Sequence, residues 1–329
     1  MPTDSRRRQV LGTLAATGLA AAGVGAARAQ AWPSKPIRIF VGFNPGGTTD
    51  PYARVYGEIL GQRLNVPVVV ENRPGAGGTL SLGALAREPA DGHTIGITTS
   101  TSVWGARTLY RRLPYDADRD FVPLGWFPVG PLLMAVPTTL PVNDVKEWVE
   151  YARKNPVSMA SYGPASVPHL ATEEFNKRYG TKVNVVHYKG EGPMWPDVST
   201  NITQAGIGSY MALAPHLARG SVKVLASVGE ERSPKLPQVT SFLSQGFDGE
   251  IFRLSGGLLM VAPAATPEDV LRRISQAFVE GADSPKAVAL RESFAIGDKP
   301  TTMDEAKRKW REESPIWIRL TDQLGIKLD

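Results

Sequence analysis

Hydrophobic and polar positions follow two alternating periods along most of the chain. Short apolar runs, such as IRIFVGF at residues 37–43, are each followed by a stretch in which apolar residues recur every three or four positions. The runs predict buried strands, and the stretches predict helices with one buried face. Their regular alternation indicates an α/β protein with largely parallel sheets.

The two patterns together predict the order of the elements. Strands are expected at residues 37–43, 68–71, 94–98, 132–136, 157–161, 183–187, 204–207, 222–227 and 254–261. Helices are expected to begin near Pro51, Thr79, Val145, Pro168, Met194, Ala212, Pro267, Pro285 and Met303.

Two stretches rich in turn formers interrupt this series. They are FVPLGWFPVGP at residues 121–131 and QGFDGEIF at residues 245–252. We interpret both as crossings between two domains, because proline and glycine break regular elements. Domain 1 then comprises residues 30–125 and 252–329, and domain 2 comprises residues 126–251. Two domains joined by two crossings can hinge around a cleft.

The first 29 residues have the composition of an export signal. Arginines at positions 6–8 precede an uncharged run rich in alanine, glycine and leucine, and Ala27-Arg28-Ala29 matches a cleavage site. A membrane anchor is the alternative, but the alanine content and the adjoining cleavage pattern favour removal. Arg7-Arg8 also resembles a twin-arginine signal. We therefore expect export to the periplasm and a soluble protein once the signal peptide has been removed.

Charge and cysteine content narrow the range of partners. The chain carries a net charge of +5, and removal of residues 1–29 takes away four arginines and one aspartate, which leaves +2. So small a charge gives no support for a nucleic-acid partner. The absence of cysteine excludes disulfides and thiolate metal sites. The four histidines lack the spacing of metal ligands, so we expect neither metal nor cofactor.

The turn after the first strand has the chemistry of an anion site. FNPGGTTDP, residues 43–51, leads into a helix whose apolar residues form one stripe. Asp50 is expected at the N-cap and Pro51 at the first helical position. The glycines and threonines at 46–49 then lie beside free amides at the positive end of the helix dipole. A turn without a ligand is the alternative.

Two later turns repeat this chemistry. The strand at 94–98 ends in the hydroxyl residues 98–102, at the edge where α/β sheets bind ligands. The strand at 157–161 leads through Gly163-Pro164-Ala165-Ser166 into a helix with Ser166 at its N-cap. Facing one another across a cleft, such turns would offer amides and hydroxyls to an anion from both walls. A solvated polar loop is the alternative for residues 98–102.

The sequence motifs support an enzyme less well than they support a binding protein. A secreted hydrolase is the rival from another class, but GIGSY at residues 206–210 lacks the spacing of a nucleophile elbow. The stretch VVVENRPGAGG at 68–78 is similar to a dinucleotide fingerprint, yet Leu80 stands where the third glycine belongs. We therefore expect a protein that is not an enzyme.

A set of segments identifies a family that this chain resembles. They are TTDPYAR after FNPGG, VVVENRPGAGG, EPADGHT, LYRRLPYDADRDFVP, PHLATEEF, HYKGEGP and RSPKLPQVTSF. In this order they resemble the extracytoplasmic solute-binding proteins of tripartite tricarboxylate transporters, the Bug receptors. The resemblance extends from about Trp32 to the C-terminus.

The resemblance implies a two-domain periplasmic binding protein fold of the Venus flytrap type, with a small carboxylate held in the cleft. The ligand would be a di- or tricarboxylate, an acidic amino acid or an aromatic acid. Binding residues carried over from the family are Phe43, Asn44, Gly47, Thr48, Asp50, Thr99, Ser100, Thr101, Ser102, Ser161, Gly163, Ala165, Ser166 and His169. It also implies membrane permease subunits as partners, and we expect a monomer.

Several positions depart from the family pattern and bear on the ligand. Gln204 replaces a common aspartate, and Ser209 falls within a usual Asp-Asn pair; both are candidate ligand contacts. Trp104 and Trp195 could stack on an aromatic acid or pack beneath a helix. Asp50 could accept an ammonium group instead of capping its helix. Which carboxylate binds stays open, as does the alternative that the receptor signals to a sensor protein.

Overall fold

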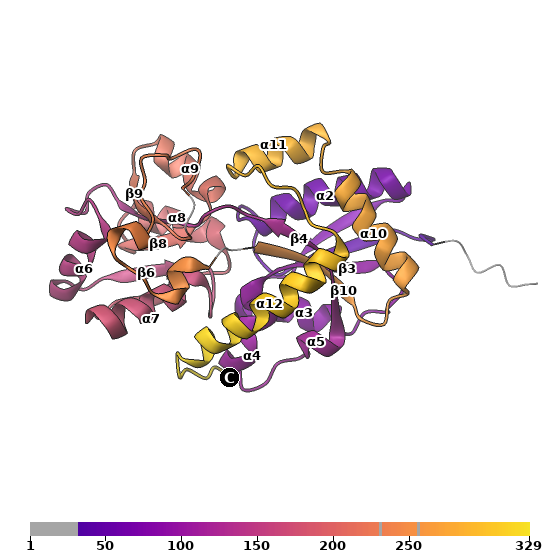
Figure 1. Ribbon diagram of the computed structural model, residues 1–329, viewed down its shortest axis with the longest axis horizontal. Helices are drawn as coiled ribbons and strands as arrows, with labels where there is room; N and C mark the ends of the chain where they lie inside the picture. The colour runs from indigo at the N-terminus through magenta and orange to yellow at the C-terminus, as the bar shows by residue number, and fades with distance from the viewer. Residues whose placement is uncertain (1–31, 230–231, 255–256) are drawn as a thin grey trace, which may run out of the picture. The chain divides into compact units, whose positions relative to one another are not determined.

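Two five-stranded sheets organise the residues that the computed structural model describes, which are 32–229, 232–254 and 257–329 (Figure 1). The first sheet contains, in spatial order, β2 (Val68–Asn72), β1 (Ile37–Val41), β3 (Thr94–Thr99), β10 (Gly257–Pro263) and β4 (Phe121–Pro128). The second contains β7 (Asn184–His187), β6 (Ser158–Ser161), β8 (Ala205–Gly208), β5 (Leu133–Pro137) and β9 (Val222–Ser227). The expected export signal lies outside the described residues.

Each sheet has one strand that runs against its neighbours. In the first sheet β1 is parallel to β2 and β3, whereas β10 is antiparallel to β3 and β4. In the second sheet β6 is parallel to β7 and β8, whereas β5 is antiparallel to β8 and β9. Four strands of each sheet therefore point the same way and one runs against them, so the sheets are mixed but largely parallel, as expected. β5 and β10 are the first strands after the chain passes between the sheets, and an apolar run carries no information on strand direction.

All the predicted strands are present, and the structure contains one further strand, β4, that the sequence analysis did not predict. This strand occupies most of the stretch at 121–131 that we interpreted as a crossing, because its prolines argued against a strand. β4 is the edge strand of its sheet, where a proline that cannot donate to the ladder is tolerated. The pairing register with β10 also shifts between Met260 and Val261, the residue opposite Pro123. The second expected crossing contains a short 3-10 helix at Glu250–Arg253.

The main helices begin within three residues of every predicted start. They are α2 (Thr49–Leu64), α3 (Thr79–Leu85), α6 (Val145–Lys154), α7 (Val167–Tyr179), α8 (Glu191–Ser199), α9 (Tyr210–Ala218), α10 (Glu268–Glu280), α11 (Pro285–Ser293) and α12 (Met303–Asp322). The sequence analysis did not predict three short elements, because none of them has a helical period of apolar residues. They are α4 (Ala106–Leu109), α5 (Ala117–Asp120) and the π-helical turn η2 (Thr101–Gly105). Across the described ranges, no helix has the length and apolarity needed to cross a membrane.

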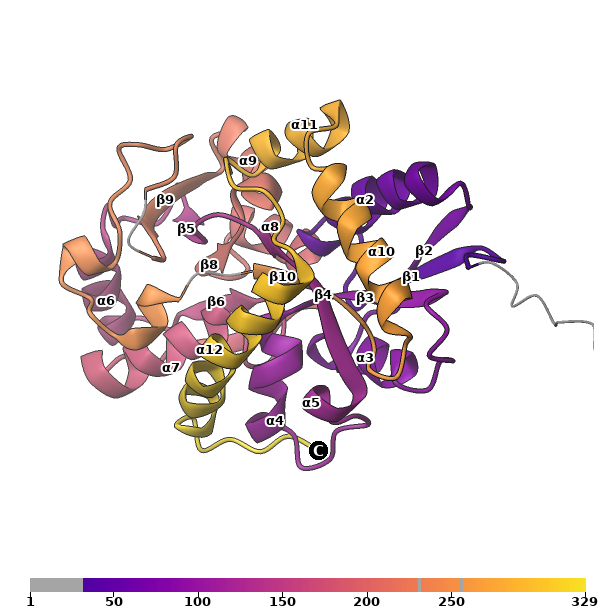
Figure 2. The ribbon, with the colours of Figure 1, turned by 45° about the vertical axis from the view of Figure 1, so that its right-hand side comes forward.

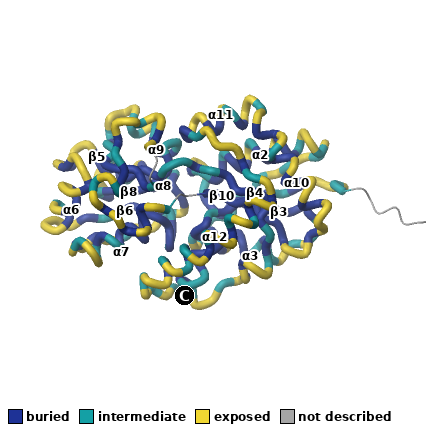
Figure 3. The backbone as a smooth tube through the Cα atoms, in the orientation of Figure 1, coloured by how far each residue is buried: buried dark blue, intermediate teal, exposed yellow. Residues whose placement is uncertain are grey.

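The inner strands of both sheets, among them β3, β5, β8 and β10, are almost entirely buried, whereas the edge strands β2 and β7 are partly exposed (Figure 3). In front of the first sheet, α12 packs against β4, η2 and α4 (Figure 2). There the Trp104 ring stacks on Trp126, with ring centroids 6.0 Å apart, and meets Trp310 edge-on at 5.6 Å. Trp195 of α8 lies against β8, where a Cβ added at Gly208 would come within 2.9 Å of its ring. Both Trp104 and Trp195 are therefore core residues.

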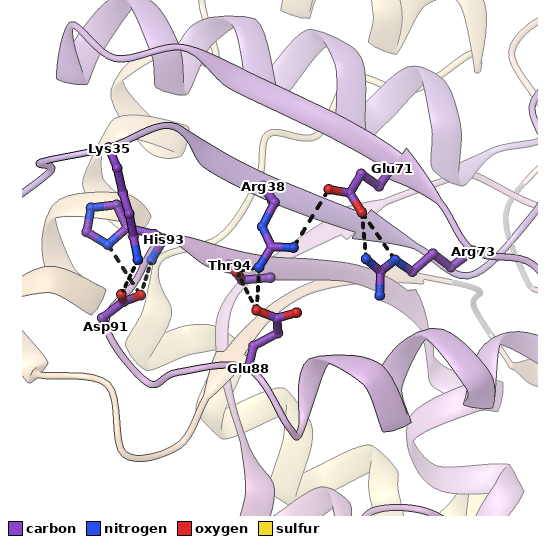
Figure 4. Close-up of polar contacts among 8 residues, drawn as sticks. All are labelled: Lys35, Arg38, Glu71, Arg73, Glu88, Asp91, His93 and Thr94. Atoms are coloured by element: carbon purple, nitrogen blue, oxygen red, sulfur yellow. Dashed lines mark hydrogen bonds and ion pairs between the residues drawn. The ribbon is translucent and has the colours of Figure 1, made fainter.

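Charged side chains link three neighbouring strands of the first sheet (Figure 4). Arg38 of β1 donates to the Glu88 carboxylate and to Thr94 Oγ1 of β3, and lies 3.8 Å from the carboxylate of Glu71 on β2. Arg38 and Thr94 stand at the amino ends of their strands. These contacts therefore join the strands away from the turns that follow β1 and β3.

Replacement of Trp104 by alanine should destabilise the protein without a ligand present. Its ring is fully buried between Trp126 and Trp310, and a large-to-small change at such a site costs about 3–5 kcal/mol. Urea unfolding measures the loss. Ile202→Ala, at a side chain that is 65% exposed, is the control and should change the free energy of unfolding by at most about 0.5 kcal/mol. A loss at Trp104 no larger than that of the control would show that its ring is not part of the core.

Candidate functional site

The turns that follow β1 and β3 meet the start of α8 around one cavity. It encloses about 550 Å³ of empty space, its mouth included. Its lining residues are Phe43, Gly47, Thr48, Thr49, Thr99, Ser100, Thr101, Val129, Leu132, Tyr162, Val167, Gly190, Glu191, Gly257, Leu258 and Trp317. Glu191 is the charged side chain in this set, which contains no lysine, arginine or histidine.

The first turn presents an uncapped helix N-terminus to the cavity. α2 begins at Thr49, two residues before the expected first helical position, Pro51, because Thr48 already has helical dihedral angles. Asp50 therefore lies inside the helix and is not its N-cap. Its carboxylate accepts hydrogen bonds from Arg54 and Asn72, each at 2.9 Å, and it is not among the lining residues. With no side-chain cap, the amides at the start of α2 remain available to a ligand.

The second turn contributes hydroxyls, one of which has no protein partner. Thr99, Ser100 and Thr101 line the cavity. The Ser100 side chain is buried, and its Oγ finds no hydrogen-bond partner among the described residues. Ser102 turns away, since its Oγ donates to the Gly77 carbonyl at 2.6 Å. A buried hydroxyl without a partner is costly unless a ligand or water completes it.

The third turn is satisfied within itself. Ser161 Oγ donates to the Gly163 carbonyl at 2.8 Å and lies 2.7 Å from Ser166 Oγ. The amide of Ala165 donates to His169 Nδ1 at 3.0 Å. These five predicted site residues do not line the cavity, although Ser166 does precede α7 as expected. Their neighbours Tyr162 and Val167 line it instead.

Three further candidates also lie outside the lining set. Gln204 joins strand ends, because its Oε1 accepts from the Ser158 amide and its Nε2 donates to the Asn201 carbonyl, both at 2.9 Å. Asn44 donates its amide to the Lys189 carbonyl at 3.0 Å. Ser209 is the N-cap of α9. It does not line the cavity itself, but its hydroxyl donates a hydrogen bond to Glu191, which does.

Glu191 is a cavity-lining residue that the sequence analysis did not predict. It is the first residue of α8, and its Oε2 accepts hydrogen bonds from Ser209 Oγ at 2.6 Å and from the Ser209 amide at 3.1 Å. Burial raises the pKa of the Glu191 carboxyl, against the opposing effect of these bonds. One feature of the sequence could have indicated this residue. Glu191 follows Gly190 in a turn between a strand and a helix, and the cavity-lining residues after β1 and β3 lie in turns of the same kind. The apolar lining residues Val129, Leu258 and Trp317 come from distant segments and carry no such signal.

Glycines allow the turns of the two sheets to touch. A Cβ added at Gly192 would lie 2.7 Å from the Pro45 carbonyl oxygen, and one added at Gly163 would lie 3.1 Å from Gly77 Cα. Real Cβ atoms essentially never approach as closely as the first of these distances. Side chains at these points would hold the turns apart and open the cavity.

Comparison with known proteins identifies the family. The family model described as tripartite tricarboxylate transporter family receptor matches residues 52–325. The chain belongs to this receptor family. Protein BugT of Bordetella pertussis is 31% identical to this receptor over 94% of the chain and 96% of its own length. The resemblance that the sequence segments indicated is thus confirmed.

Solved structures share the fold of this receptor. An R. palustris protein with adipate is 28% identical, with a TM-score of 0.83 over 90% of this chain and 100% of its own. The periplasmic binding protein BugD is 26% identical, with a TM-score of 0.82 over the same shares. The receptor therefore has the two-domain periplasmic binding protein fold that we expected.

Glu191→Gln should remove a pH-dependent loss of stability from the ligand-free receptor. Because burial raises the pKa of Glu191 in the folded state, folding favours its protonated form. The wild type should therefore lose free energy of unfolding relative to the variant as the pH rises above about 4.3, the value for an unperturbed glutamate. Urea unfolding between about pH 4 and 8 measures this difference. Glu292→Gln, at an exposed residue of α11, is the control; a constant difference between wild type and Glu191→Gln across this range would contradict the prediction.

Proposed function

We propose that this protein is a periplasmic receptor that captures a small carboxylate in the cavity between its two sheets. It would present the ligand to the membrane permease of a tripartite tricarboxylate transporter, without catalysis. The observation that carries the proposal is the buried Ser100 hydroxyl, which has no hydrogen-bond partner among the described residues; Ser100 lines the same cavity as the uncapped start of α2. Amides and hydroxyls in such an arrangement suit a carboxylate group.

The family relationship supports this choice of ligand. Adipate is present in the R. palustris relative, whose sequence is 28% identical. Of the predicted binding residues, we retain Phe43, Gly47, Thr48, Thr99, Ser100 and Thr101, which line the cavity. We assign residues 30–125 and 252–329 to one domain and residues 126–251 to the other, with the ligand between them. The receptor acts as a monomer in this proposal.

The binding test is thermal unfolding of residues 30–329 against carboxylic acids and their uncharged amides. Adipate, hexanoate and benzoate, each beside its amide, cover dicarboxylates and apolar monocarboxylates. A ligand at 100 times its dissociation constant should stabilise the folded receptor by about 2.7 kcal/mol, which shifts the melting temperature by a few degrees or less. Stabilisation by an acid but not by its amide is the expected result. Equal shifts with both would argue against carboxylate capture.

Gly192→Ala tests whether capture needs the two turns to meet. The added Cβ would lie 2.7 Å from the Pro45 carbonyl oxygen, so it should oppose closure around the ligand while leaving each sheet intact. We expect at least about a tenfold loss of affinity for the acid, equivalent to 1.4 kcal/mol, with little change in ligand-free stability. Gly297→Ala is the matched control, because an added Cβ there meets nothing within 4 Å. Calorimetric titration that gives the same affinity for both variants would exclude this role of closure.

A further inference from the structure

The cavity that we propose for a carboxylate already contains a carboxyl group. Glu191 lines it together with Thr48 and Ser100, and no cationic side chain is present among the lining residues. Two ionised carboxylates in a site without a cation would repel each other strongly at low dielectric. Two carboxyls that share one proton would instead form a short, charge-assisted hydrogen bond.

We propose that Glu191 carries a proton and donates it to the carboxylate of the captured acid, so that Glu191 is a specificity-determining residue. This inference rests on the proposed function and states how the site accepts its ligand. The proton remains on Glu191 as a hydrogen-bond donor, and no covalent bond is made or broken. The site would then accept an acid that arrives as an anion and would disfavour ligands that bring an ammonium group.

The hydrogen bonds around Glu191 fit a neutral carboxyl. Both donors of Ser209, its amide and its hydroxyl, point to the same oxygen, Oε2. A protonated carboxyl has one carbonyl oxygen, which can accept two such bonds, and one hydroxyl, which must donate. Oε2 takes the carbonyl role, and Oε1 is left to carry the proton. The Thr48 hydroxyl also interacts with this carboxyl and, like Ser209, opposes the effect of burial on its pKa. Ser209 thus acts as a positioning residue that fixes which oxygen is protonated.

The Glu191 side chain is closely packed against β8 and against the turn that follows β1. A Cβ added at Gly208 of β8 would lie 3.2 Å from the Glu191 Cδ, and one at Gly47 would lie 3.6 Å from its Cβ. Burial accordingly raises the pKa of this carboxyl. Among the charged groups of the neighbouring elements, Asp50 of α2 is already paired with Arg54.

Other titratable groups near the cavity must be separated from Glu191 in any test. Tyr162, at the end of β6, has its pKa raised far above neutrality by burial. His169 and His187 lie behind the third turn, and burial lowers the pKa of His169 to about 4. Glu313 precedes Trp317 by one turn of α12, and burial raises its pKa to about 7. Glu313 is therefore the group whose titration could be mistaken for that of Glu191.

The experiment compares wild type, Glu191→Gln and Glu313→Gln with adipate, hexanoate and benzoate by calorimetric titration from about pH 5.5 to 8.5, where these acids are ionised. Wild-type affinity should fall as the pH rises, approaching about tenfold per pH unit above the pKa of Glu191 in the free receptor. Buffers with different ionisation enthalpies should report uptake of up to one proton in that range. Glutamine mimics the neutral carboxyl, so Glu191→Gln should bind with little pH dependence, whereas Glu313→Gln should behave as the wild type does.

Two results would overturn the inference. An affinity that falls at every pH in Glu191→Gln, together with tighter binding of an amino acid than of the corresponding plain acid, would mean that Glu191 is ionised and accepts an ammonium group. A pH dependence that disappears in Glu313→Gln but persists in Glu191→Gln would assign the proton to α12.

A measurement without ligand separates this inference from the proposed function. Infrared difference spectra between wild type and Glu191→Gln at about pH 6.5 should contain the C=O stretch of a protonated carboxyl. If no acid binds but this band is present, the carboxylate ligand is wrong and the protonation of Glu191 stands. If acids bind and the band is absent both with and without ligand, capture stands and the proton on Glu191 is excluded.

Discussion

The site depends on how closely two glycine-bearing turns approach each other. Pro45 and Gly46 belong to the turn after β1, and Gly192 lies in the first turn of α8, yet a Cβ added at Gly192 would lie 2.7 Å from the Pro45 carbonyl oxygen and 3.5 Å from Gly46 Cα. This close approach brings the amides at the start of α2 and α8 to one point, because helix N-termini carry free N–H groups. A side chain at Gly192 would keep these groups apart, so glycine is required there by proximity and not by backbone conformation.

Inside the cavity, the positive electrostatic potential comes from helix dipoles and not from positively charged side chains. Within the described part of the chain, the residues that line the cavity include no cationic side chain. The positive potential must come from helix N-termini, whose effect extends over about one turn. Glu191 stands against that background as a carboxyl held by Ser209. If Glu191 is neutral, it adds a hydrogen-bond donor to the amides and hydroxyls that line the cavity. If it is ionised, its carboxylate can only accept hydrogen bonds.

The two sheets bring these turns together through the direction of single strands. In each sheet the antiparallel strand, β10 or β5, is the one that enters after the chain has changed sheets. The remaining strands arise from strand–helix–strand units, whose parallel pairing collects the turns after β1 and β3 at one edge. The turns that line the cavity are thus gathered by topology and not by proximity in sequence.

The sequence by itself determined the element order, the starts of the main helices and the family, because periodicity, capping residues and segment motifs are local properties. It also indicated that the turns after β1 and β3 face a ligand. It could not reveal β4, since the tolerance of Pro123 depends on an edge position in the finished sheet. The sequence could not show that the hydroxyls of Ser161 and Ser166 in the third turn lie within hydrogen-bond distance of each other once folded. Only the tertiary structure decided that Trp104 packs in the core and that Glu191 enters the cavity, because burial and pairing depend on residues far away along the chain.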